Sequence, residues 1–382
     1  MNYHPPEFLN TLQRYALGAG LAAFALSVIG AFIEPVQFFQ SYLVSLVFWI
    51  SIALGALFLT LLHHLTGAKW SVVLRRFFEN IMTLIPWLAL LFIPLFFGLS
   101  HLYEWSHSPL HDELLAHKSP YLNVRFFILR NVLYFCIWSA LAMALYRASR
   151  RQDVGGTGQP FVRLSAPGVI LFALTVTFAA FDWLMSTEAH WYSTIFGVYF
   201  FGASTLAAIA VVTLTALFFR RRNMLRDAIT ASHYHDLGKL LFTFTIFWAY
   251  IAFSQYFLIW YANIPEETVW YAHRWTGSWK SVSLLLVFGH FIVPFFTLMT
   301  RAAKSHLSFL TLISLWLLAM HWLDLHWIVS PVFHPDGLSL SWLDFTTLLA
   351  VGGCAVAALA RRFGAAPLIP INDPNLSETS HA

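Results

Sequence analysis

Ionisable side chains interrupt an apolar stretch at residues 181–191, "FDWLMSTEAHW". Asp182 directly follows a long apolar run, and Glu188 and His190 come a few residues later. A carboxylate so close to hydrocarbon is costly, which makes Asp182 a candidate functional residue. It could accept and release protons, or it could serve only as a hydrogen-bond partner for a neighbouring helix.

A second concentration of such groups lies in "MHWLDLHW", residues 320–327. His321 and Asp324 are three positions apart, so in a helix they share one face. A carboxylate beside an imidazole can pass a proton, although a plain His–Asp hydrogen bond between helices would explain the pair equally well. His290 lies alone in "LLLVFGHFIVPFF", where it could relay protons across the apolar middle.

A third group joins histidines to basic residues at the ends of apolar runs. His63 and His64 open "HHLTGAKW", while Asp236 and Lys239 lie in "HYHDLGKLL". Together they could form the cytoplasmic mouth of a proton path. Taken singly, each is also explained as an interfacial residue whose polar head reaches water.

Arg130 lies inside the apolar run that follows residue 122, in "NVRFFILRNVLYF". A buried guanidinium needs a counter-charge, and by depth either Asp182 or Glu104 could supply it.

The sequence offers no pattern for a bound metal, cluster or haem. The two cysteines, Cys136 and Cys354, lie in separate apolar runs, so no C-x-x-C or C-x-x-C-H motif exists. No apolar run carries two histidines a bilayer's thickness apart, which disfavours b-type haem. No nucleophile–base pattern stands out either.

The elements that must position these residues are membrane-spanning helices. Of the 382 residues, 59% are hydrophobic and 10% are charged, and the mean hydropathy is +0.67, more apolar than a soluble core can bury. A helix needs about 20 apolar residues to cross the hydrocarbon. The sequence predicts an all-α integral membrane protein, a single polytopic domain over residues 1–382. Its ten predicted spans are 15–33, 40–62, 81–99, 122–146, 165–185, 192–219, 239–262, 280–299, 307–329 and 341–360.

The positive charges predict the orientation of these spans. With the N-terminus inside, 17 of the 22 lysines and arginines fall in inner loops and in the cytoplasmic tails, residues 1–14 and 361–382. We therefore expect both termini in the cytoplasm. The net charge of +4 then reflects topology and gives no argument for nucleic acid as a partner. The five basic residues left outside are Lys118, Arg125, Arg130, Arg274 and Lys280.

Internal similarity suggests how the spans are grouped. "FFGLSHLYEW" (96–105) and "IAFSQYFLIW" (251–260) end the third and seventh spans with the same order of polar and aromatic residues. A four-span repeat predicts two four-helix bundles, spans 2–5 and 6–9, flanked by the first and tenth helices. In the loop after Asp182, we expect Ser193 or Thr194 to cap the sixth helix.

Four segments together resemble the integral membrane F subunit of bacterial alternative complex III, a quinol:electron-acceptor oxidoreductase. The chain is also similar to the wider polysulfide-reductase (NrfD-like) family of membrane subunits, a resemblance that implies the same two-bundle architecture. The segments are "HHLTGAKW", "AFDWLMSTEAHWYSTIFGVYFFGAS", "HYHDLGKLLFTFTIFWAYIAFSQYFLIWYANIPEE" and "PLIPINDPNL".

The resemblance implies a role inside a larger assembly of the bacterial inner membrane. Partner subunits, including a paralogous membrane subunit, would surround this chain together with lipids. Those partners would carry haem c and iron–sulfur clusters, while this chain would hold no redox centre of its own. Quinol is the one small molecule that the family also associates with this kind of subunit.

Three hypotheses follow. The leading one is a structural, proton-conducting subunit, with a path through Asp182, His290, His321 and Asp324 towards the cytoplasmic mouth described above. The alternative is a quinol site near the outer face, in which His101, Glu104, Arg130 and Asp182 would bind and deprotonate quinol. A secondary transporter is the third, and the parallel rather than inverted repeat argues against it.

Overall fold

The computed structural model describes residues 6–107, 112–156 and 158–376. All regular structure in these ranges is helical, and ten helical segments are long and apolar enough to cross a membrane, which confirms the predicted fold class. The ten are α1 (Phe8–Ile33), α2 (Pro35–Thr66), α3–α4–η1 (Val72–Phe97), α7 (Val124–Asp153), α8 (Phe161–Trp183), α9 (Phe196–Arg221), α10 (Ala231–Ala262), α12–η4–α13 (Trp279–Met299), α15–η5 (Leu307–Val332) and α16 (Trp342–Gly364).

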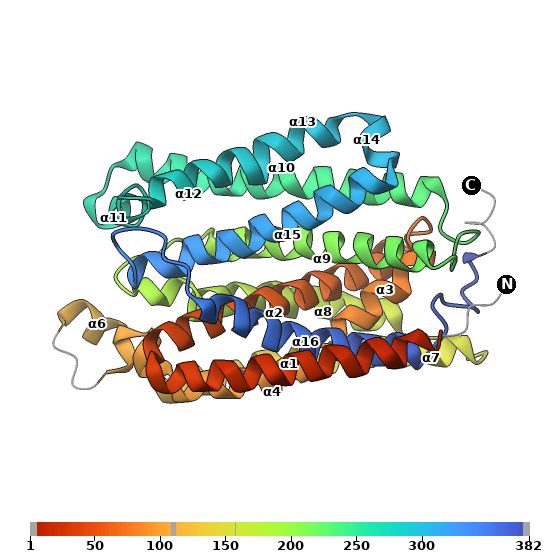
Figure 1. Cartoon of the computed structure of the whole chain (residues 1–382), viewed down its shortest axis with the longest axis horizontal. Coiled ribbons are helices and arrows are strands. Elements are labelled where there is room, and N and C mark those ends of the chain that lie inside the picture. Colours follow the sequence, from red (N-terminus) through yellow and green to blue (C-terminus); the bar gives the residue numbers. More distant parts are fainter. Residues whose placement is uncertain (1–5, 108–111, 157, 377–382) are drawn as a thin grey trace.

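Short helices occupy the connections between these spans. The list is α5 (Leu99–Leu102), η2 (Glu104–Ser106), α6 (Glu113–Lys118), η3 (Met185–Glu188), α11 (Pro265–His273) and α14 (Arg301–Ser305). The spans run side by side along the longest axis of the molecule, and the start of α1 and the end of α16 lie at the same end (Figure 1). We call this the terminal end and the other the opposite end; α6 and α11 lie at the opposite end.

Two helices form the centre of the molecule. In the most apolar 18-residue stretch of α2, 89% of the residues are buried. The corresponding share is 78% in α9 and 22% in α1. Gly55 of α2 permits this contact, because a Cβ there would overlap the carbonyl oxygen of Ser204 in α9. Around this pair, α2 contacts α3, α4, α7 and α8, while α9 contacts α10 and α15. The division into two four-helix bundles remains a prediction with which these contacts agree.

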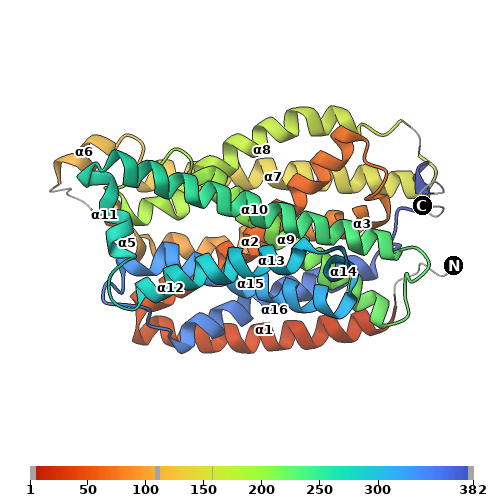
Figure 2. The same ribbon diagram turned by 90° about the horizontal axis from the view of Figure 1, so that it is seen from above.

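Helices α1 and α16 pack along each other at one edge of the molecule (Figure 2). Their backbones approach closely where Gly20 meets Gly353 and Cys354, since a Cβ on Gly20 would lie 3.0 Å from the Cys354 amide nitrogen. Small residues allow this kind of packing between membrane helices. Helix α16 in turn packs against α2, so the first and tenth spans brace one side of the centre.

The third and eighth spans are interrupted within their length. Prolines 86 and 94 lie in the first turns of α4 (Ile85–Phe92) and η1 (Ile93–Phe97), where the third span is broken into segments. In the eighth span, Pro294 follows a π-helical segment, η4 (Leu286–Ile292), because proline cannot donate the next helical hydrogen bond. The indole of Trp316 donates to the Gly289 carbonyl oxygen at 2.7 Å within that segment. Short π-helical segments are common at functional sites.

Two equivalent tryptophans give the internal repeat a structural counterpart. Trp183, in "FDWLMS" at the end of α8, donates to Asn131 of α7 at 2.6 Å. Trp327, in "LHWIVS" near the end of α15, donates to Ser283 of α12 at 2.8 Å. Each links the fourth helix of its proposed bundle to the third.

The expected cap of the sixth helix is wrong. Helix α9 begins at Phe196 after Ile195, and no side chain caps it. Ser193 instead donates to the Gln255 side chain at 2.9 Å. The hydroxyl is engaged by a helix distant in sequence, which a local motif does not reveal.

Candidate functional site

Three of the predicted residues lie in one buried polar cluster between α9, α10, η4 and α15. Asp324 is fully buried and accepts a hydrogen bond from the Tyr199 hydroxyl through Oδ1. His321 Nε2 lies 2.8 Å from the Ser51 hydroxyl of α2. His321 and Asp324 therefore have separate partners rather than each other. Within the described residues, Asp324 Oδ2 and His321 Nδ1 have no hydrogen-bond partner.

His290 completes this central cluster from the π-helical segment. Its ring stacks on Trp248 with centroids 4.0 Å apart, and it lies close enough to His321 for their charges to interact. In the described part of the chain, both nitrogens of His290 have no partner. Nε1 of Trp248 makes no hydrogen bond of normal geometry, but Trp248 lies close enough to the Asp324 carboxylate to interact with it. More than nine in ten buried polar groups are hydrogen-bonded in folded proteins. So many unpaired atoms in one place are unusual and favour a functional role for this cluster.

A cavity of about 790 Å³ lies between α10, α11, α12 and η4 and adjoins two residues that contact this cluster, although His290, His321 and Asp324 do not line it. Its inner wall includes Tyr199 and Trp248, whereas Phe253 and Val287 are exposed on the outer side. The remaining lining is mostly aliphatic and aromatic, from α10, α11, α12 and η4. An apolar cavity with a few convergent polar groups is the usual form of a small-molecule site.

At the opposite end of the molecule, the polar groups that line this cavity are largely paired with other residues. Gln255 donates to the Tyr271 hydroxyl at 3.1 Å, and burial raises the pKa of Tyr271. Arg274 forms an ion pair with Glu188 at 2.8 Å and donates to the carbonyl oxygens of Trp270, Trp327 and Ile328. Burial lowers the pKa of Arg274, and Glu188 opposes this shift. Sequence reasoning missed the Glu188–Arg274 pair, whose residues lie in different loops.

Asp182 lies apart from the central cluster. It binds Arg130 of α7 through both carboxylate oxygens, at 2.8 and 2.9 Å, and accepts a third hydrogen bond from Tyr134 at 2.8 Å. Asp182, rather than Glu104, is therefore the counter-charge of Arg130. The carboxylate is fully satisfied, and it contacts neither His321 nor Asp324. Arg130 also lies over the Tyr121 ring, 3.8 Å from its centroid.

The four residues expected for a quinol site are not gathered in one place. Arg130 and Asp182 form the buried pair, while His101 stacks on Phe39 with centroids 5.4 Å apart. Glu104 is 64% exposed and lies 3.9 Å from the His190 ring. That ring also bonds Asp112 at 2.8 Å.

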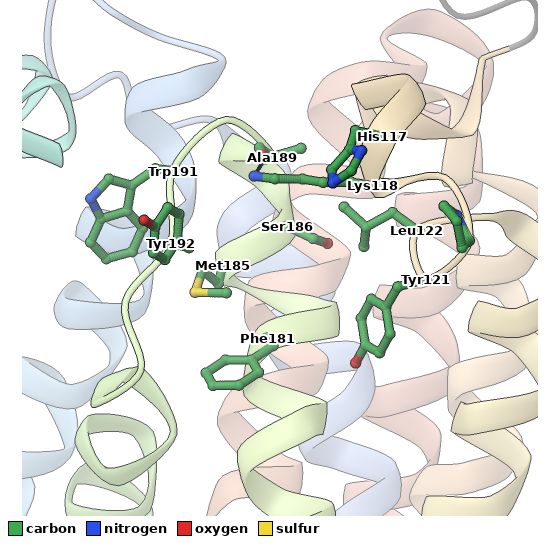
Figure 3. A pocket seen from close by; sticks show the side chains of 11 residues that line it. His117, Lys118, Tyr121, Leu122, Phe181, Met185, Ser186, Ala189, Trp191 and Tyr192 are labelled. Atoms are coloured by element: carbon green, nitrogen blue, oxygen red, sulfur yellow. Dashed lines mark hydrogen bonds between the residues drawn. The ribbon is translucent and has the colours of Figure 1, made fainter. Parts of the chain in front are cut away.

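A smaller cavity of about 250 Å³ lies at the opposite end, between the α6–α7 connection, the end of α8 and the α8–α9 connection (Figure 3). Tyr121 and Phe181 line its base, with Lys118 at the rim, where the lysine donates to the Ala189 carbonyl oxygen at 2.6 Å. Burial lowers the pKa of Lys118. Its lining includes neither His101 nor Glu104, so it does not assemble the expected quinol site.

At the terminal end, only part of the expected cytoplasmic mouth comes together. His63 and His64 line a cavity of about 510 Å³, and His63 Nδ1 lies 2.7 Å from the Ser71 hydroxyl. Asp236 and Lys239 form their own ion pair at 2.6 Å in the first turns of α10 and do not line this cavity.

An ion network in α3 was not expected from the sequence, which placed Arg75 and Arg76 in an inner loop. Both are buried, because α3 begins at Val72 and carries them into the molecule. Arg75 pairs with Glu79 and with Asp373 of the C-terminal segment; Arg76 pairs with Asp153 at 2.6 Å. The run "RRFFEN" was the available signal, since its arginines and glutamate are spaced for pairs within one helix.

In the described ranges, no group of three histidine, cysteine or acidic side chains is arranged to hold a metal ion. No family model and no curated protein matches this sequence.

Proposed function

We propose that this chain is a membrane subunit of a respiratory quinol:electron-acceptor oxidoreductase of the alternative complex III type, in which it conducts protons. Proton conduction rests on one observation, the central cluster of His290, His321 and Asp324 with its unpaired polar atoms. The respiratory assignment rests on the sequence resemblance. Under this proposal, the complex lies in the bacterial inner membrane, and partner subunits supply the haem c and iron–sulfur clusters.

The proposed path enters the molecule at Tyr199 and Asp324 and continues through His290 and His321 to Ser51 of α2. From there it follows α2 to His63 and His64, which lie about 18 Å farther along the helix at 1.5 Å per residue. Water must bridge much of this distance, because α2 is otherwise mainly apolar there. Asp182 is left out of the path, since its oxygens are bound by Arg130 and Tyr134.

The test uses the purified complex reconstituted in liposomes, with proton transfer and quinol oxidation recorded in the same samples. Asp324→Asn keeps an oxygen for Tyr199 but cannot be ionised. We expect proton transfer to fall about 100-fold or more while electron transfer continues, because a positioned proton-transfer group typically contributes about 10²–10⁴-fold. Glu104→Gln, an exposed carboxylate, is the control and should change neither rate. Unchanged proton transfer in Asp324→Asn would contradict the proposal.

A second candidate function is quinol binding, favoured by the cavity of about 790 Å³ rather than by the residues first expected. Its apolar walls suit an isoprenoid tail, and Gln255 and the Tyr271 hydroxyl in its lining offer polar groups to the head-group oxygens. An electron acceptor would have to come from a partner subunit.

Filling the cavity separates the two functions. Ala252→Trp adds bulk to the cavity wall without touching an ionisable group. If quinol reacts there, turnover should collapse in an assembled complex, whereas proton conduction through this chain alone predicts little change in turnover. Tyr250→Trp, on an exposed lining residue, provides a milder control.

A further inference from the structure

A second cluster of largely buried polar groups lies near the opposite end of the molecule, where α15 ends and α2 and α16 begin (Figure 1). We call it the Asp344 cluster. Its members are Asp344, His326, His334, Gln37, Gln40, Ser41 and Ser330. The proposed proton path starts at Tyr199 and Asp324, which are both buried, so it needs a connection to the surface at this end.

Asp344 is a buried carboxylate whose hydrogen-bond partners carry no charge. Within the described residues, it accepts from the Ser41 hydroxyl through Oδ1 and from the Ser341 amide at 2.8 Å through Oδ2. His326 is buried as well, and it lies close enough for its charge to interact with that of Asp344. An isolated buried carboxylate is costly, and a proton shared with a neighbouring imidazole removes that cost. Asp344 and His326 should therefore hold one proton between them.

The imidazole of this pair has a nitrogen that can bind a proton without first breaking a hydrogen bond. His326 Nδ1 lies 3.2 Å from the Ser330 hydroxyl, while its Nε2 has no partner in the described ranges. Gln40 donates to the same hydroxyl at 2.8 Å. These contacts fix His326 at the junction of α15 and α2.

His334 connects the pair to the surface. It is only partly buried, in the connection between η5 and α16, and it lies close enough to His326 for their charges to interact. Its Nε2 lies 2.9 Å from Gln37 Oε1, and Gln37 donates to the Ser41 hydroxyl at 3.0 Å. Because Ser41 also binds Asp344, these hydrogen bonds hold His334 beside the pair.

Buried hydroxyl groups along α2 connect the Asp344 cluster to the central cluster. Thr347, one turn after Asp344 in α16, lies 2.8 Å from the Ser45 hydroxyl of α2. Farther along α2, Ser51 binds His321 of the central cluster at 2.8 Å. The step from Ser45 to Ser51 is the longest, about 9 Å along the helix axis at about 1.5 Å per residue. Hydroxyl groups both donate and accept hydrogen bonds, as a proton relay requires.

We propose that Asp344 and His326 form a second proton site, through which protons pass between the central cluster and His334 at the opposite end. This site rests on the proposed function and supplies the part of the path between the central cluster and the surface. In the exchange between the two histidines, an N–H bond of one imidazolium breaks and the neutral imidazole of the other binds the proton. Asp344 stabilises the imidazolium form of His326.

The first test uses the complex in liposomes, with proton transfer and quinol oxidation recorded together. Asp344→Asn can still accept from the Ser341 amide and bond Ser41, so α16 keeps its capping box, but the side chain cannot be ionised. We expect proton transfer to fall about 100-fold while electron transfer continues. Asp336→Asn alters an exposed carboxylate of the same connection and should change neither rate.

Asp324→Asn separates failure of this site from failure of the proposed function. If Asp324→Asn stops proton transfer and Asp344→Asn does not, the chain conducts protons by another route and the second site is overturned. If neither variant affects proton transfer, the proposed function fails and this site fails with it.

Infrared spectroscopy of the purified complex distinguishes a proton site from a structural hydrogen bond. At neutral pH the shared proton should give either a carboxylic-acid band that Asp344→Asn removes or an imidazolium signal that His326→Gln removes. His117→Gln, an exposed histidine of α6, should leave both signals as in the wild type. If neither signal is lost in its variant, Asp344 is a permanently ionised cap beside a neutral histidine, and the proposed site is overturned.

Discussion

Two buried aspartates near the opposite end have contrasting environments. Asp182 is neutralised by Arg130 and fully hydrogen-bonded, whereas Asp324 bonds only Tyr199 and keeps one oxygen unpaired among the described residues. A satisfied buried ion pair is a structural feature that is costly to break. A partly satisfied carboxylate in the same cluster as two histidines is the better candidate for proton transfer. The same residue type therefore has two roles, set by its partners.

Replacing Asp182 by asparagine should destabilise the protein. The change leaves the Arg130 guanidinium buried without its counter-charge, and removing one partner of a buried pair costs about 3–5 kcal/mol. Glu104→Gln alters an exposed carboxylate and should change stability by less than about 0.5 kcal/mol. Denaturation in detergent, followed by circular dichroism, compares the two. Equal stability of both variants would show that Arg130 finds another partner.

Asp112 provides a pH prediction outside the membrane-spanning segments. The hydrogen bond from His190 lowers the pKa of Asp112 from 3.8, helped by the Leu115 amide. Because the folded pKa is the lower one, the stabilisation is fully present above pH 3.8 and is lost as the pH falls through the folded value.

Carbon-13 NMR of the Asp112 carboxyl group tests this directly. Its midpoint should lie below 3.8 in the wild type and move up towards that value in His190→Ala. An unchanged midpoint in the variant would remove His190 as the cause. Glu113→Gln, next in sequence and outside this hydrogen bond, controls for a general loss of charge or hydrogen-bonding capacity nearby.

At the scale of elements, the contact between α2 and α9 depends on a missing side chain. Gly55 allows the backbone of α2 to approach Ser204, and a Cβ there would also lie 2.7 Å from the Ala208 Cβ. Both neighbours belong to a buried, continuous helix that cannot yield locally. The close approach brings Ser51 of α2 within reach of His321, so helix packing positions the central cluster.

Gly55→Ala should therefore destabilise the protein by about 1–3 kcal/mol, the usual cost of inserting a methyl group into a packed core. Gly18→Ala is the matched control in α1, where a Cβ would meet no atom within 4 Å. There, better helix propensity should raise stability by about 0.5–1 kcal/mol. Chemical denaturation in detergent measures both, and opposite signs are expected. A neutral Gly55→Ala would mean that the two helices can move apart without cost.

At the scale of the whole molecule, contacts between distant segments hold the spans together at both ends. Glu188, in the loop after α8, pairs with Arg274 after α11 at the opposite end. Arg75 pairs with Asp373 at the terminal end, where Leu368 and Ile369 of the C-terminal segment are also fully buried. Part of the expected cytoplasmic tail, around Leu368, Ile369 and Asp373, is therefore packed against the helices.

The orientation of the whole molecule in the membrane is testable by labelling. In a variant without Cys136 and Cys354, we expect Glu266→Cys to react with a membrane-impermeant maleimide in intact cells. Arg226→Cys should react only after lysis, because the positive charges predict that the terminal end is cytoplasmic. The reverse pattern would invert the topology and with it the direction of the proposed proton path.

The sequence by itself determined the class of the protein and the number of spans. Each span is recognised from its own sequence, as about 20 apolar residues, whichever helices it packs against. The span boundaries depend also on which charged residues pair with one another. Helix α3 begins at Val72, well before the predicted start of the third span, because buried Arg75, Arg76 and Glu79 neutralise one another there. Ion pairs allow these charged residues to lie in a buried helix. A hydropathy pattern does not show which charged residues will pair.

Only the tertiary structure decided which polar residues share a site. The partners are far apart in sequence: Arg130 and Asp182 by 52 positions, Tyr199 and Asp324 by 125, Ser51 and His321 by 270. A short motif places two side chains on one helix face, but it does not say which other helix supplies their partners. In a buried, low-dielectric interior those partners determine whether an ionisable group is satisfied or available for chemistry, so this distinction emerges only once the helices are packed.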